Sequence, residues 1–253
     1  MVRGIANSKI RFGDLILLLR YFFKLKVSTH PNNASYQIDN TAKKIQFSNH
    51  QFFYILKNEN LTIDQRLKFL PDLAHFVMSF SDLNNYVLPY ANPQNKYEEA
   101  INLHCKEDAN HWPWYLYDLK KLNLDQSQLL SDTLKYLWGD KISPSRKLSY
   151  ELVSLTSNQC PFIRYVAIEV MEATGNVVFN VLNEITKETH LNLKFCSEIH
   201  LSHKTGHTIG AGTDVFDDYP TSTDTKLKSI IVIEKSFNAF AKFMDQLENK
   251  LKE

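Results

Sequence analysis

Glycine and proline are scarce in this sequence, with only 7 glycines and 8 prolines among 253 residues. These residue types dominate tight turns, so a fold of many short strands joined by turns is disfavoured and long helices are favoured. A chain of this length can bury one large core. Apart from a histidine spacing that two segments share, the sequence has no internal repeat and no sign of a second domain. The sequence therefore predicts an all-α protein, with residues 1–253 folded as a single multi-helical bundle.

Cysteine is also rare, and the three cysteines show no CxxC spacing. An odd number of widely spaced cysteines argues against a disulfide framework. Such usage is typical of proteins from a reducing compartment. We therefore expect a cytoplasmic protein.

The chain has no excess of either charge, since its formal net charge is +1. This balance gives no reason to expect nucleic acid or an acidic membrane surface as a partner. The apolar run at residues 15–23 is interrupted by Arg20 and is too short to span a bilayer. It also lacks the small-residue cleavage site of a signal peptide. We interpret residues 1–45 as an N-terminal helix followed by a loop over residues 28–45, both packed on the bundle, with attachment to a membrane surface as the alternative.

Several catalytic signatures are missing as well. The sequence has no glycine-rich phosphate loop, no GxSxG nucleophile elbow and no zinc-ribbon spacing. What the chain does contain is two histidine-rich segments and an apolar segment that carries acids. These three segments supply every candidate metal ligand.

The first histidine-rich segment contains His104, Glu107, Asp108 and His111. On a helix these positions follow the i, i+3, i+4, i+7 pattern and share one face. Imidazole and carboxylate together suit iron and neighbouring metals, so this face is a candidate metal-ligand set. The alternative is a solvated, charged helix face.

The second segment repeats the spacing with His200, Lys204 and His207, and it adds His203 one residue before the lysine. The acidic, threonine-rich stretch that follows, residues 209–225, is predicted to be a mobile loop that covers the site. Two segments with the same histidine spacing favour a shared metal site more strongly than either segment alone.

Glu169 and Glu172 interrupt the apolar helix that is predicted to begin at Pro161. A buried ionised carboxylate costs several kcal/mol unless it is paired or bound to a metal. A metal held by the histidines would satisfy both acids, whereas the alternative is salt bridges to a basic residue such as Arg164. Asp118 is a candidate acceptor for the N–H of a ligating histidine, unless it is simply solvated.

Other patterns set the expected helix boundaries. Thr62 and Gln65 have capping-box spacing, and a long helix is predicted from there to about Tyr90, with a kink at Pro71. The first histidine-rich segment is predicted to lie on one helix over residues 98–122, kinked at Pro113. The second is predicted to lie on a helix over residues 189–208. A last helix is expected over residues 226–251.

Together these residues resemble the haem-oxygenase-like di-iron oxidase and oxygenase family. The resemblance covers roughly residues 45–210 and rests on three segments in order: His104-x2-Glu107-Asp108-x2-His111-Trp112, the helix with Glu169, Glu172 and Ala173-Thr174-Gly175-Asn176, and His200-x3-Lys204-Thr205-Gly206-His207. It implies one helical bundle with a metal site between its helices.

The resemblance also implies a cofactor and a ligand set. The cofactor would be one or two iron ions, with manganese as an alternative, and the partners would be O₂ and a small organic substrate. The implied ligands are histidines and acids on three helices: His104, Glu107, Asp108, His111, Glu169 or Glu172, His200, His203 and His207. Lys204 stands where the family has an acid, which leaves the number of metals open.

The sequence is also compatible with a homodimer and with two alternative functions. One alternative is a non-catalytic binding or regulatory protein that retains the bundle with a degenerate site. The other is a metal-free enzyme of the same fold that works by acid–base or thiol chemistry.

Overall fold

The computed structural model describes residues 34–206 and 215–253, and within these ranges it contains helices and no strand. The prediction of an all-α protein is thus confirmed. In chain order the elements are α2 (Ala34–Ser48), α3 (Gln51–Leu56), α4 (Ile63–Leu67), η1 (Leu70–Leu73), α5 (Ala74–Asp82), the π-helical η2 (Leu83–Val87), α6 (Lys96–Asp108), α7 (Trp112–Lys121), α8 (Leu130–Trp138), η3 (Asp140–Ile142), α9 (Ser143–Thr156), α10 (Pro161–Thr186), α11 (Glu198–Gly206) and α12 (Thr223–Lys252).

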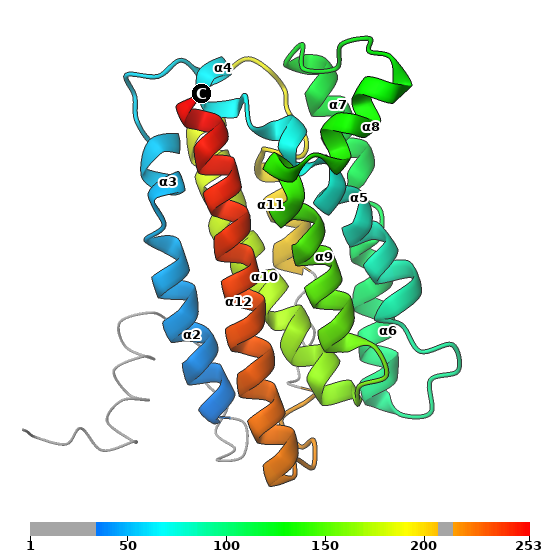
Figure 1. Ribbon diagram of the computed structural model, residues 1–253. Helices are drawn as coiled ribbons and strands as arrows, with labels where there is room; N and C mark the ends of the chain where they lie inside the picture. Colours follow the sequence, from blue (N-terminus) through cyan, green and yellow to red (C-terminus); the bar gives the residue numbers. More distant parts are fainter. Residues whose placement is uncertain (1–33, 207–214) are drawn as a thin grey trace, which may run out of the picture.

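The two longest helices, α10 and α12, pack against each other and form the centre of the bundle. Helix α12 also contacts α2, α3 and α9, and α10 also contacts α6 and α11. Figure 1 shows α12 running the length of the bundle, with α2 on one side and α9 on the other. The candidate site residues lie on α10, on α6 and α11, which pack against it, and in the break after α6.

Local sequence signals explain where several helices begin. Thr62 and Gln65 form the expected capping box at the start of α4. Asn95 caps α6 by accepting hydrogen bonds from the backbone N–H groups of the next turn. Pro161 lies in the first turn of α10, where its missing N–H is not needed.

Two predicted long helices are broken in the structure. The segment after Thr62 divides into α4, η1, α5 and η2, and Pro71 lies in the 3₁₀ turn. The predicted helix over residues 98–122 is two helices, because α6 ends at Asp108 and α7 begins at Trp112. The second histidine-rich helix, α11, begins at Glu198 rather than near Thr189.

The N-terminal prediction was wrong in one respect. Residues 34–45 were expected to be loop, but they belong to α2, which begins at Ala34. Within the described residues, no helix is both long enough and apolar enough to cross a membrane. Of the predicted mobile loop 209–225, residues 209–214 lie outside the described part. The following turn packs on the body, since the buried ring of Phe216 stacks on Tyr165 of α10 with ring centroids 4.2 Å apart.

Phenylalanine rings fill the space between α2, α3 and α12. Phe47 contacts Phe53, Phe237 and Phe240 in edge-on arrangements, with centroids 5.5 to 6.4 Å apart. Edge-on contacts between rings add to the stabilisation that burial alone provides. These rings thus hold the middle of α12 against α2 and α3.

Candidate metal centre

The last turns of α6 and the middle of α10 bring one histidine and two acids together. His104 Nε2 lies 3.5 Å from Asp108 Oδ2 and 3.9 Å from Glu172 Oε1. The candidate ligand atoms of these three residues lie within 4.8 Å of one another. The side chains of His104 and Asp108 are almost completely buried, whereas that of Glu172 is 15% exposed. We call these residues the His104 cluster.

The break between α6 and α7 places His111 beside this cluster. His111 precedes α7, and its Nδ1 lies 3.9 Å from Asp108 Oδ1. The break itself is fastened to a neighbouring helix, because the hydroxyl of Ser81 on α5 donates to the carbonyl of Ala109 at 2.6 Å. Asp108 therefore has a histidine near each of its two carboxylate oxygens.

His200 of α11 lies next to His111, on the side away from His104 and Glu172 in the order of contacts. Its ring lies edge-on to His111, with centroids 4.7 Å apart, and Phe179 covers it at 3.8 Å. His200 Nδ1 lies 3.0 Å from the carbonyl oxygen of Phe195. Because a carbonyl can only accept, Nδ1 carries the proton and the lone pair is on Nε2. This is the tautomer that a metal-binding histidine needs.

Asp118 does not orient a histidine directly, contrary to the hypothesis from the sequence, and it is not solvated either. Its carboxylate accepts the backbone N–H groups of Lys194 at 2.7 Å and Cys196 at 2.9 Å. Burial raises the pKa of Asp118, and these hydrogen bonds oppose the rise. The residue between the two donors is Phe195, whose carbonyl holds His200. Asp118 thus acts through the chain segment before α11.

The environment of Asp108 fits a bound cation. Neither of its carboxylate oxygens has a hydrogen-bond partner in the described part of the chain, although both are buried. A buried carboxylate without hydrogen bonds is strongly unfavourable. Ligand atoms about 2.1 Å from one ion lie within about 4.2 Å of each other, so the His104 cluster has to contract only slightly to hold one. Imidazole with carboxylates is a donor set that suits a first-row divalent metal.

The structure distinguishes Glu172 from the other predicted acids. Glu107 and Glu169 are half-buried and lie outside the His104 cluster. Glu169 and Glu172 both act on Lys44 of α2, whose pKa burial lowers while the two carboxylates oppose that shift. Lys44 is therefore a basic residue that lies near both acids.

Arg164 has other partners. Its guanidinium donates to the carbonyls of Pro89 and Gln159, both at 3.2 Å, and lies over the ring of Tyr90. Of the remaining predicted ligands, His207 lies outside the described residues, and so do the side chains of His203 and Lys204 on α11. Their part in the site stays a prediction.

A cavity of about 100 Å³ adjoins the candidate ligands. Asp108, His111 and His200 line it on one side. Its other lining residues are mainly large apolar side chains from α5, α10 and α12, among them Phe76, Phe80, Phe240 and Phe243. Side chains that could hold a metal thus meet an apolar space inside the bundle.

No family model and no curated protein matches this chain. The candidate centre therefore rests on the geometry of its own residues. The haem-oxygenase-like architecture, which the sequence motifs suggested, stays a prediction.

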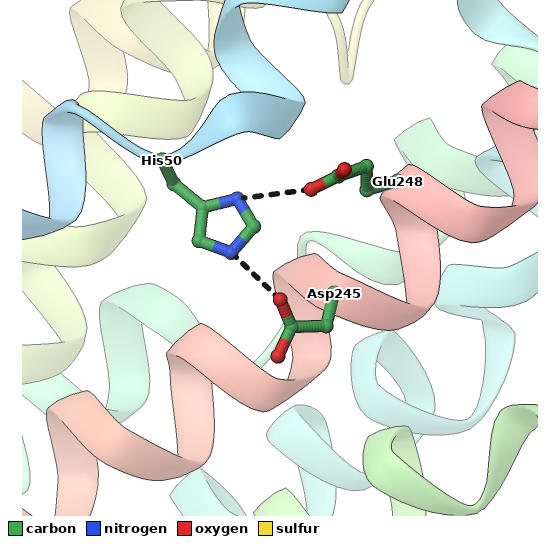
Figure 2. Close-up of side chains that lie close together, drawn as sticks. All are labelled: His50, Asp245 and Glu248. Carbon is green, nitrogen blue, oxygen red and sulfur yellow. Dashed lines mark hydrogen bonds and ion pairs between the residues drawn. The ribbon is translucent and has the colours of Figure 1, made fainter.

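A second group of one histidine and two acids, His50, Asp245 and Glu248, escaped the sequence analysis. Figure 2 shows the His50 ring at the start of α3, between two acids of α12. His50 Nδ1 accepts the backbone N–H of Phe52 and caps α3, while Nε2 lies 3.1 Å from Asp245 Oδ1. With Nδ1 accepting, Nε2 carries the proton, so neither nitrogen offers a lone pair to a metal. This group ties α3 to α12 and is not our candidate site.

Proposed function

We propose that this protein is a non-haem iron enzyme that activates O₂ to oxidise a small organic substrate. The observation that carries the proposal is Asp108, a fully buried carboxylate that accepts no hydrogen bond from residues 34–206 or 215–253 where their side chains are described, placed between two histidines and beside an apolar cavity. The motifs that resemble the haem-oxygenase-like di-iron family support the same reading, including its fold.

His104, Asp108 and Glu172 would hold one ion, and their two carboxylates would offset its charge. His111 and His200, on the other side of Asp108, would provide ligands for a second ion. Iron held by histidines and carboxylates with open coordination positions binds and reduces O₂, and manganese is the alternative metal.

The residues around the candidate ligands have separate tasks. The carbonyl of Phe195 fixes the ring of His200, and Phe179 shields that ring. Asp108 accepts from no protein donor within the described chain, so its oxygens are available to a cation. The apolar cavity excludes water and orients the substrate against these ligands.

Metal-free thiol chemistry fits the site less well. Burial raises the pKa of the Cys105 thiol to about 12 and that of Cys196 well above its ordinary value. Thiolate, the nucleophilic form, is therefore scarce at both residues near neutral pH. Cysteines 105, 160 and 196 are unpaired, which agrees with our proposal of a cytoplasmic protein. A homodimer stays a prediction.

Anaerobic titration with Fe(II) tests the proposal. We expect the wild-type protein to bind iron and, once loaded, to consume O₂. His104→Ala should weaken iron binding at least about tenfold, since a lost ligand leaves an unfilled coordination position. The matched control is His190→Ala, because His190 is exposed and belongs neither to the His104 cluster nor to the cavity lining. That variant should bind iron like the wild type.

Two outcomes would contradict the proposal in different ways. If His104→Ala and His190→Ala load iron equally well, the ligand assignment is wrong. If the wild type takes up neither Fe(II) nor Mn(II), the protein is not a metal enzyme. A helical binding or regulatory protein with a degenerate site would then be the better reading.

A further inference from the structure

Few polar groups line the cavity away from the candidate ligands. The hydroxyl groups in its wall are those of Ser81 and Thr174. Ser81 donates to the carbonyl of Ala109 at 2.6 Å, and Thr174 donates to the carbonyl of Val170 at 2.9 Å, so both protons are used within the protein. The other lining side chains are apolar or aromatic. An occupant therefore meets mainly apolar contacts.

The wall of the cavity belongs to the packed core. Phe69, which precedes η1, Thr174 of α10, and Phe243 and Leu247 of α12 all line the cavity and are at most 2% exposed. Protein interiors are packed as densely as organic crystals and have low compressibility. An occupant larger than the cavity would therefore have to displace packed side chains, which is unfavourable.

The volume of the cavity limits the size of its occupant. The cavity measures about 100 Å³, whereas an apolar cavity that binds benzene measures roughly 150 Å³. It thus has about two thirds of the volume that holds six carbon atoms, which corresponds to about four carbon atoms. This limit follows from volume alone and applies to an occupant of any shape.

We propose that the cavity selects its occupant by size: it binds an apolar molecule or substrate group of at most about four carbon atoms and excludes a six-membered ring. The consequence for the substrate rests on the proposed function. In that function the cavity would hold a small apolar group of the organic substrate beside Asp108, His111 and His200. The substrate class is then small aliphatic compounds rather than aromatic ones.

Binding of isobutane and benzene to the metal-free protein tests the size limit. The two hydrocarbons have four and six carbon atoms and no polar group. Methyl resonances of labelled methionine report the place of binding, because Met171 and Met244 line the cavity whereas Met78 is exposed and does not. We expect isobutane to shift the resonances of Met171 and Met244 but not that of Met78. Benzene should bind at least about tenfold more weakly than isobutane.

One pair of variants locates the binding. Val178→Phe fills the cavity and should weaken isobutane binding at least about tenfold. The matched control, Val153→Phe, makes the same change at a partly exposed position of α9 that does not line the cavity, and it should bind like the wild type.

A second pair of variants tests whether size is what excludes benzene. Phe243→Ala removes a ring from the buried wall and should allow benzene to bind. Phe76→Ala makes the same change at a less buried position of the wall, and it serves if the first variant does not fold. Circular dichroism checks that each variant is folded.

The experiment separates this inference from the proposed function because no metal is present. If isobutane leaves Met171 and Met244 unchanged, or if benzene binds the wild type as tightly as isobutane does, the size limit is wrong even when the iron titration succeeds. It is equally wrong if Val178→Phe binds isobutane normally, or if the widened variants fold and still exclude benzene. Should the hydrocarbons behave as expected while iron is not bound, the cavity assignment stands and the redox proposal fails.

Discussion

Asp108 makes a prediction that changes sign with the metal. In the metal-free protein at about pH 8, where histidine is mostly neutral, Asp108→Asn should raise the melting temperature, because it removes a buried charge that receives no hydrogen bond from the part of the chain the structure describes. With iron present the same change should lower it relative to wild type. A ligand at a hundredfold excess over its dissociation constant raises the free energy of unfolding by about 2.7 kcal/mol. The variant should lose much of this increase because it binds iron more weakly.

Thermal unfolding of both proteins, with a chelator and with anaerobic Fe(II), measures the effect. If the substitution shifts the melting temperature equally under both conditions, then Asp108 does not bind the metal. Such a result would leave its burial without hydrogen bonds unexplained.

Residue types and spacing identified most of the candidate ligands but could not choose between neighbouring acids. Glu169 and Glu172 are three residues apart and therefore lie on the same side of α10. Which one reaches His104 depends on how α6 packs against α10, and that is a contact between distant segments. The spacing also predicted that His111 lies on the same helix as His104. In the structure α6 ends at Asp108, and the break that follows places His111 beside Asp108.

At the scale of elements, Asp118 on α7 fastens the segment that leads into α11. Asp118→Asn should destabilise the protein by about 1–3 kcal/mol, because an amide cannot accept from both backbone N–H groups with equal geometry. It should also weaken iron binding, since Phe195 would hold His200 less firmly. Urea unfolding and hydrogen exchange at residues 194–196 measure the two effects.

Asp125→Asn is the matched control for this experiment, because Asp125 is exposed in the loop after α7. It should change neither stability nor exchange. Faster exchange in both variants, or in neither, would show that the Asp118 carboxylate does not hold this segment.

The helix breaks were harder to predict than the helices. Apolar residues continue at helical spacing through α4, η1, α5 and η2, so periodicity alone indicates one long helix. The 3₁₀ turn at Pro71 and the π-helical turn at residues 83–87 keep the same residues facing the core while changing the direction of the chain. Pro113 similarly signalled a kink where the structure begins a new helix.

At the scale of the whole molecule, composition was sufficient for the fold class but not for the arrangement. Few glycines and prolines, with apolar residues at helical spacing, indicate a helical bundle. That α2 and α12 pack side by side follows from contacts between segments nearly two hundred residues apart, such as Phe47 with Phe237 and Phe240. No local pattern specifies such neighbours.

The central place of α12 has a consequence for how the chain folds during synthesis. Helices α2, α3, α9 and α10 all pack against α12, yet they leave the ribosome before it. Until α12 arrives, their apolar faces and one wall of the cavity are uncovered, and such surfaces are prone to aggregation. A chain that stops before Thr223 should therefore be helical by circular dichroism, bind a hydrophobic dye and unfold without a cooperative transition. Cooperative unfolding of that shortened chain would show that the other helices form a core without α12.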